Sequence, residues 1–186
     1  ESAQAVYAAI AFGMGKKINN NDVTMKTIQK YSNLFSVDGN IGDIRNNLPD
    51  DWIKSSITGA NELYNRFGRR GKYTFHRGDA TVNRINSAFT RAKAVEGVRM
   101  DINKWNPSDI WMVKDGQQSN LASLLDSEGT IDCLNNFLDL AFTDTQYENK
   151  SGKNVPAKSL IGISLKKLGE PVNLKVMNPV GKDRLR

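Results

Sequence analysis

Residues 105–116 read WNPSDIWMVKDG, and the character of the chain changes at this point. The Asn-Pro-Ser-Asp segment at 106–109 is typical of a turn, and the run from Ile110 to Lys114 is rich in residues that favour strands. Asp115-Gly116 is a turn signal that ends the run. Helical patterns dominate before this stretch, and β-prone segments follow it. We therefore predict an α+β or α/β protein with a small mixed β-sheet and a mainly helical N-terminal half.

The N-terminal half carries a succession of helix signals. Residues 2–14 are Ala-rich, with Val6, Ile10 and Met14 four residues apart, which predicts a helix with one apolar stripe. Asn20-Asn21-Asp22 supplies capping chemistry for a second helix, and Pro49-Asp50-Asp51 opens a third. The segment 37–47 is turn-rich. We predict helices at 2–14, 23–35, 51–67 and 80–94, and a short strand at 72–76.

The C-terminal half mixes one more helix with β-prone segments. Ile131, Leu134, Leu138 and Phe142 are spaced for burial on a helix at 130–142. The segments SLIGISLKK at 159–167 and PVNLKVMN at 171–178 favour strands. We divide the chain into a helical part, 1–97, and a sheet-forming part, 98–186, that carries the site, within one compact domain.

Composition indicates the class of partner. Lys and Arg total 26 against 20 Asp and Glu in 186 residues, so the formal net charge is +6. This charge favours binding to a polyanion, most simply DNA, although an ordinary basic soluble protein would have it too. The single cysteine, Cys133, excludes an internal disulfide framework and a zinc site made of cysteines. No apolar run reaches the length of a membrane span.

We therefore expect DNA as the partner, no membrane, and a cytoplasmic or virion-associated location. A homodimer or larger assembly stays open.

Two segments carry the residues that phosphodiester hydrolysis requires. Asp109 stands at the entry of one predicted strand and Lys166 near the end of another. A carboxylate there would hold a divalent cation, which neutralises the scissile phosphate and acidifies a bound water. The ammonium would orient that water or stabilise developing charge. We predict that the two strands are neighbours.

At these residues the chain resembles the PD-(D/E)xK nuclease superfamily, whose core pairs a Pro-Asp-type aspartate with a downstream acid-x-Lys on an adjacent strand. The counterparts are Asp109, Ser164 and Lys166, and Ser164 stands where the family usually has Asp or Glu. The segment 163–169, ISLKKLG, is similar to a variant of the family with Ser-x-Lys. The resemblance implies a restriction-endonuclease-like fold, a DNA endonuclease activity and Mg²⁺ as the cofactor.

In such nucleases a second acid can come from the helix before the sheet. Glu62 on the third predicted helix is the candidate, so that Asp109 and Glu62 would be the metal ligands. Asp101 is a weaker alternative. The alternative for Glu62, and the commoner one for an acid on a polar helix face, is an ordinary surface position.

Positive residues concentrate between positions 66 and 77, where no acid occurs. Aromatic residues alternate with them, which is typical of a surface that contacts phosphates, although most of those aromatics are expected in the core. Trp105 and Trp111 flank Asp109, and burial is the expected role of both. The predicted DNA contacts are Arg66, Arg69, Arg70, Lys72, Arg77 and Lys167.

His76 is the single histidine and has two interpretations. It would serve as a general base or, more commonly for a lone histidine, have a structural role. The segment 73–78, YTFHRG, is also faintly similar to the arginine strand of ADP-ribosyltransferases, but the partner motifs of those enzymes are missing.

Two hypotheses about function follow. The first is a Mg²⁺-dependent deoxyribonuclease. The second is a non-catalytic DNA-binding protein, or a phage virion structural protein, that keeps a nuclease-like fold; the neutral Ser164 favours this alternative.

Overall fold

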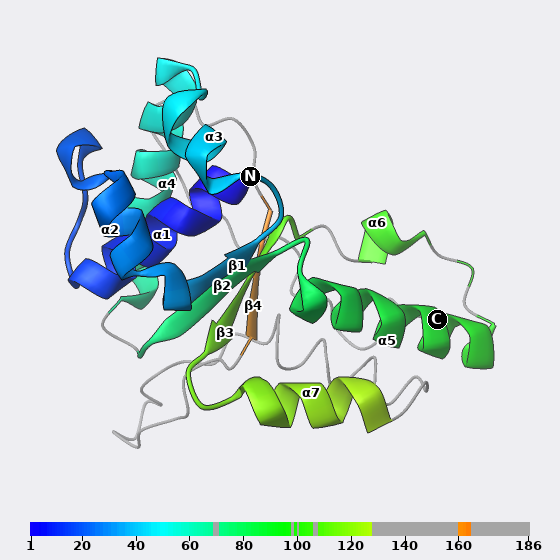
Figure 1. Cartoon of the computed structure of the whole chain (residues 1–186). Coiled ribbons are helices and arrows are strands. Elements are labelled where there is room, and N and C mark those ends of the chain that lie inside the picture. The colour runs from blue at the N-terminus through cyan, green and yellow to red at the C-terminus, as the bar shows by residue number, and fades with distance from the viewer. Residues whose placement is uncertain (69–70, 98, 100, 106–107, 128–159, 165–186) are drawn as a thin grey trace.

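The computed structural model describes residues 1–68, 71–97, 99, 101–105, 108–127 and 160–164. Four strands form one mixed sheet in the spatial order β1-β2-β3-β4, and the helices pack around it (Figure 1). The helices are α1 (Ser2–Met14), α2 (Met25–Lys30), α3 (Ile41–Asn46), α4 (Asp50–Phe67), α5 (Ala80–Glu96), α6 (Ile102–Trp105) and α7 (Gln118–Ser127). The strands are β1 (Phe35–Val37), β2 (Tyr73–Arg77), β3 (Ile110–Lys114) and β4 (Leu160–Ile163). Short 3₁₀ turns cover Asn20–Asp22 and Ser32–Leu34.

The sheet mixes both strand directions. β1 pairs with β2 in parallel, whereas β2 with β3 and β3 with β4 are antiparallel. This architecture confirms the predicted α+β class with a small mixed sheet and a helical N-terminal half. β1 and β2 come from residues before position 97, so the sheet is not confined to the part that begins at residue 98.

Helices cover both faces of the sheet (Figure 1). One core forms where α1 and α4 meet the side chains of Tyr73, Phe75, Ile110, Met112 and Ile163. A second core forms on the other face, where α5 and α7 meet Trp111, Val113 and Leu160. Successive residues of β3 belong to opposite cores, as the two-residue period of a strand requires.

The first helix is more deeply buried than its predicted apolar stripe indicates. Residues 3–11 are buried around the whole circumference, because small alanines let α4 and the sheet approach from different sides. Gln4 is part of this contact, where its Nε2 donates a 3.1 Å hydrogen bond to the carbonyl of Ser56. A Cβ on Gly59 would lie 2.7 Å from the Gln4 amide oxygen, so glycine permits this approach.

Several predicted elements are confirmed by the structure. The helix at 2–14 has the expected bounds, and the helices at 51–67 and 80–94 match α4 and α5 closely. The strand at 72–76 corresponds to β2, and the β-prone run from Ile110 to Lys114 is β3. Part of 159–167 forms β4. The predicted helix at 130–142 and the segment 171–178 lie outside the described residues.

The prediction of one helix across 23–35 is wrong. α2 ends at Lys30, a 3₁₀ turn follows, and Phe35–Val37 is a strand. This edge strand exists because Phe35 and Val37 pair with Phe75 and Arg77 of β2, a long-range contact that local periodicity does not reveal. The turn-rich segment 37–47 contains the short helix α3, which is capped by Asn40.

Among the described residues, no helix combines the length and the apolar character needed to cross a membrane.

Candidate functional site

The entry of β3 and the exit of β4 meet at one end of the sheet. Ile110 pairs with Ile163, and the main-chain amide of Asp109 donates a 2.8 Å hydrogen bond to the carbonyl of Ile163. That carbonyl belongs to the peptide group that joins Ile163 to Ser164. Asp109, just before β3, and Ser164, just after β4, are therefore neighbours at the ends of adjacent strands, and Ser164 is exposed.

The hydrogen bond also marks the end of the strand pairing. Ile110 is the first residue of β3 and pairs with Ile163, and the amide of Asp109, outside the strand, bonds to the carbonyl of the same Ile163. The regular pairing of β3 with β4 therefore ends at Ile110.

A glycine in β4 lets the segment before β3 pack tightly. A Cβ on Gly162 would collide with the Ser108 hydroxyl and would lie 2.8 Å from the Trp111 ring. Trp111 is fully buried, as expected, and pairs with Gly162 across the sheet. The absence of a side chain at position 162 thus allows Ser108 and Trp111 to lie against β4, and it holds Asp109 beside Ser164.

The same end of the sheet contains an ion-pair cluster around Arg77. Its guanidinium donates to Asp38, and its Nε donates a 3.0 Å hydrogen bond to the Glu1 carboxylate. Burial alone would lower the pKa of Arg77, but the bonds to Asp38 and Glu1 outweigh it and raise that pKa. In turn, the hydrogen bond from Arg77 lowers the pKa of Asp38. Arg77 is therefore paired with two acids of the protein itself, and its contact with DNA stays a prediction.

His76 is bound through both ring nitrogens. Its Nε2 lies 2.8 Å from the Thr74 hydroxyl, and its Nδ1 lies 2.7 Å from the Asp79 carboxylate. Asp79 also caps α5 by accepting a 3.1 Å hydrogen bond from the amide of Val82. Because the His76 side chain is only 12% exposed and both nitrogens have partners, its position supports the structural interpretation over the general base.

Opposing effects act on the pKa of Asp79. Burial would raise the pKa of Asp79, but the hydrogen bonds from His76 and from the Val82 amide outweigh it and lower that pKa. The carboxylate therefore stays charged while it joins β2 to the first turn of α5.

Glu62 lies near the C-terminal end of α1. Tyr64, two positions further along α4, donates a hydrogen bond from its hydroxyl group to the carbonyl of Gly15, just past the end of α1. Another neighbour, Asn61, exchanges hydrogen bonds of 2.7 and 2.9 Å with the main chain of Ile18.

Asp109 belongs to the opposite end of α1. His76 pairs with Trp111, so Arg77 lies across from Ile110, and Arg77 holds Glu1 at the N-terminus of α1. A helix of 13 residues is about 20 Å long, which separates the two ends. The contacts therefore place Glu62 and Asp109 towards opposite ends of α1, and the structure does not bring the two predicted metal ligands together. The sequence shows that a helix carrying Glu62 precedes the sheet, but it does not show which end of that helix approaches Asp109.

The other predicted cations are only partly covered by the structure. The Arg66 guanidinium lies 5.5 Å from the centre of the Phe67 ring, and Lys72 is exposed before β2. Phe67, Tyr73 and Phe75 are buried, as expected for the aromatics of this stretch. Four predicted residues lie outside the described part of the chain: Arg69, Arg70, Lys166 and Lys167.

Sequence reasoning missed Asp38 and Gly78. Asp38 follows β1, and its amide donates a 3.0 Å hydrogen bond to the carbonyl of Arg77. Gly78 has a φ of 63°, and a Cβ there would lie 2.5 Å from the Asp38 carboxyl group. The only local signals were the turn dipeptides Asp38-Gly39 and Gly78-Asp79.

Asp109 and Ser164 at the sheet end supply few oxygen ligands for a magnesium ion. Among the described residues, no group of three or more His, Cys, Asp or Glu side chains could hold a metal. Mg²⁺ commonly keeps several waters and binds through one or two carboxylates together with substrate phosphates. Asp109 supplies one carboxylate, and Ser164 adds a neutral oxygen. This set is compatible with a cation that a phosphate helps to bind.

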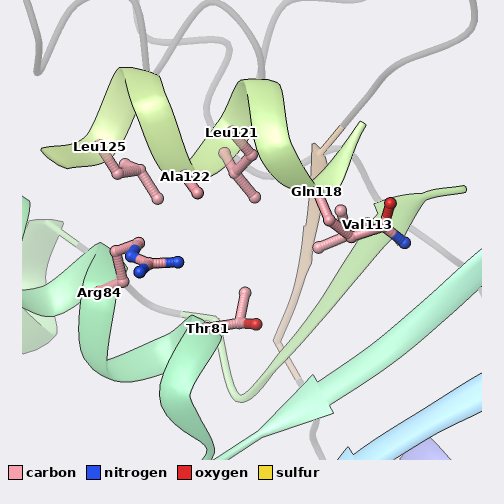
Figure 2. A pocket seen from close by; sticks show the side chains of 7 residues that line it. All are labelled: Thr81, Arg84, Val113, Gln118, Leu121, Ala122 and Leu125. Carbon is pink, nitrogen blue, oxygen red and sulfur yellow. The ribbon is translucent and has the colours of Figure 1, made fainter. Parts of the chain in front are cut away.

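A small cavity of about 70 Å³ lies between α5, α7 and β3 (Figure 2). Its lining is Thr81, Arg84, Val113, Gln118, Leu121, Ala122 and Leu125. Arg84 forms a 3.0 Å ion pair with Asp126 of α7. The lining contains no carboxylate, histidine or cysteine, and ligand pockets are usually several times larger. The cavity is therefore a poor alternative to the sheet end as a reaction site.

Comparison of the chain with protein-family models, with curated proteins and with solved structures found no significant match, and we infer its function from the geometry above.

Proposed function

We propose that the protein is a metal-dependent DNA endonuclease whose site is formed by Asp109, Ser164 and Lys166. The observation that carries this proposal is the 2.8 Å hydrogen bond from the Asp109 amide to the Ile163 carbonyl. It supports a site at this end because an acidic residue and the start of a Ser-x-Lys segment come from strands that meet there. Lys166 follows Ser164 by two positions in the sequence.

Each residue would have a separate task. Asp109 would hold Mg²⁺, which, when bound, neutralises the phosphate and acidifies a water. The Ser164 hydroxyl would donate a hydrogen bond to a phosphate oxygen or hold the attacking water. Lys166 would orient that water and stabilise the negative charge that develops during cleavage. Glu62 has no task in this site.

The cation stretch would bind DNA away from the bond that is cleaved. Lys72 precedes β2 and Gly78 follows it, and the six residue steps between them span about 20 Å in an extended strand. At 3.4 Å per base pair this distance corresponds to about six base pairs. Lys72 would therefore contact a phosphate about six base pairs from the site. Arg66, Arg69, Arg70 and Lys167 are the other predicted DNA contacts of this proposal. The net charge of +6 supports such contacts.

The alternative is a non-catalytic DNA-binding protein or a phage virion structural protein with a nuclease-like fold. Two observations favour it. Ser164 is neutral, and within the described part of the chain Asp109 belongs to no set of three acidic, histidine or cysteine side chains that would bind a metal. Both hypotheses include binding to DNA and a cytoplasmic or virion-associated location, so the decisive difference is cleavage.

Plasmid DNA tests the proposal. The wild-type protein is incubated with supercoiled plasmid in Mg²⁺, in Mn²⁺ and in a chelator, beside Asp109→Ala and Lys166→Ala. We expect nicked or linear DNA only with the metal and the wild-type protein. Intact plasmid in every lane, together with a mobility shift of the DNA, would favour the alternative. Cleavage that survives both substitutions would place the reaction elsewhere.

A further inference from the structure

One cation, Arg77, is shared by two carboxylates at the sheet end. Its Nε donates to Glu1 at 3.0 Å, and its guanidinium also donates to Asp38. The two acids come from different parts of the chain, one at the start of α1 and the other after β1. A single guanidinium therefore has two carboxylate partners.

Asp38 is held in position by more than the ion pair. Its amide donates to the carbonyl of Arg77 at 3.0 Å, and its carboxylate accepts a 3.1 Å hydrogen bond from the Ser2 hydroxyl. Gly78 leaves room for the carboxylate, which would meet a Cβ at that position. The carboxylate is thus presented to the guanidinium by its surroundings rather than by chance contact of two long side chains.

Both acids are nonetheless open to solvent. The side chains of Glu1 and Asp38 are 46% and 49% exposed, while that of Arg77 is 26% exposed. Ion pairs with exposed members have small net free energies, so another anion can replace one partner. A phosphate offers a guanidinium the same paired oxygens as a carboxylate does.

Arg77 also lies next to the proposed site. It is the last residue of β2 and stands across from Ile110, the residue after Asp109. Neighbouring strands are about 5 Å apart, so the main chain at Arg77 lies one strand away from the main chain at the site. A DNA strand with a phosphate at Asp109 would bring a neighbouring phosphate to this cation.

We propose that Arg77 is a guarded phosphate contact: Glu1 and Asp38 occupy its guanidinium in the free protein, and a DNA phosphate displaces them on binding. This inference rests on DNA as the partner in the proposed function, but it does not require cleavage. Breaking the contacts of Arg77 with Glu1 and Asp38 costs part of the free energy of DNA binding. DNA that is not seated at Asp109 cannot recover that loss, so the guard favours DNA placed for reaction.

The test measures binding of a labelled duplex by fluorescence anisotropy between 50 and 200 mM salt, with a chelator present. Each phosphate contact contributes about 0.9 to the slope of log affinity against log salt. We expect Arg77→Ala to lower this slope by about 0.9. We expect Asp38→Asn, alone and with Glu1→Gln, to raise affinity severalfold while the slope stays unchanged, because competition is removed but the number of contacts is the same.

Two kinds of control accompany these variants. Asp43→Asn removes an exposed acid on α3 and reports the general effect of one negative charge, which we expect to be smaller than that of Asp38→Asn. Thermal unfolding by circular dichroism confirms that each variant folds. An unchanged slope in Arg77→Ala, or equal gains from Asp38→Asn and Asp43→Asn, contradicts the guard. So does a wild-type protein that fails to bind the duplex at any salt concentration.

The outcome is separable from that of the plasmid assay. A protein that shows the expected slopes but never cleaves keeps the guarded contact and loses the nuclease activity. A protein that cleaves normally while Arg77→Ala has the wild-type slope keeps the activity and loses the guard.

Discussion

The amide of Asp109 and the carbonyl of Ile163 are joined by a 2.8 Å hydrogen bond between residues that are more than fifty positions apart in the sequence. This contact brings the entry of β3 to the exit of β4 and puts Ser164 beside Asp109. The packing of Ser108 and Trp111 against Gly162 holds the two segments together.

Gly162→Ala should destabilise the protein and disturb the site. The added methyl group would collide with Ser108 and press on the buried Trp111 ring. Overpacking of this kind typically costs about 1–3 kcal/mol. Urea unfolding measures the loss, and Ser164→Ala, at an exposed position, is the control that should stay within about 0.5 kcal/mol of the wild type. Equal stability of Gly162→Ala and the wild type would show that β4 moves freely away from Trp111.

Asp109→Ala and Glu62→Ala form a matched pair of carboxylate removals. If Asp109 holds the cation, its loss should reduce Mg²⁺-dependent cleavage at least about 100-fold, a reduction comparable to removing one electrostatic contact of a reaction site. Glu62→Ala should cleave normally, because Glu62 lies near the opposite end of α1. Initial rates of plasmid nicking measure both. A strong defect in Glu62→Ala with full activity in Asp109→Ala would reverse our assignment.

Asp79→Ala should lose stability in a pH-dependent way. The folded-state pKa of Asp79 is lowered, so its contribution is present at neutral pH and is lost as the pH falls below the ordinary carboxyl value towards the folded value. Loss of a helix cap alone costs about 1 kcal/mol. Denaturant unfolding at pH 7 and pH 3 should show a smaller gap between wild type and variant at the lower pH. A gap that is constant or larger at pH 3 would contradict the role of the charge.

His76→Gln separates a structural histidine from a catalytic one. Because both ring nitrogens bond within the fold, the substitution should lower thermal stability by removing at least one of the contacts to Thr74 and Asp79. The pH dependence of cleavage should keep its shape, since a residue that transfers no proton does not set that profile. Loss of one limb of the pH profile in an otherwise folded variant would establish His76 as a general base.

Local sequence patterns predicted the helices and strands that are specified by residues close together in the sequence. The helix at 2–14, the long helix before residue 67 and the strand after Pro107 follow from apolar spacing, capping residues and turn dipeptides. These signals arise from side chains within one or two turns of each other, and they persist whatever the rest of the chain does. The mixed α+β class was predictable for the same reason.

Tertiary structure alone determined which predicted residues share a site. Nothing local distinguishes Glu62, which lies near the far end of α1, from Asp38, which reaches Arg77 across the sheet. The strand at Phe35–Val37 likewise exists only because β2 is there to pair with it. The sequence determined the elements and the positive charge, because these depend on neighbouring residues and on composition. The meeting of Asp109 with Ser164 and the pairing of Arg77 depend on strand register, which is set by packing over the whole chain.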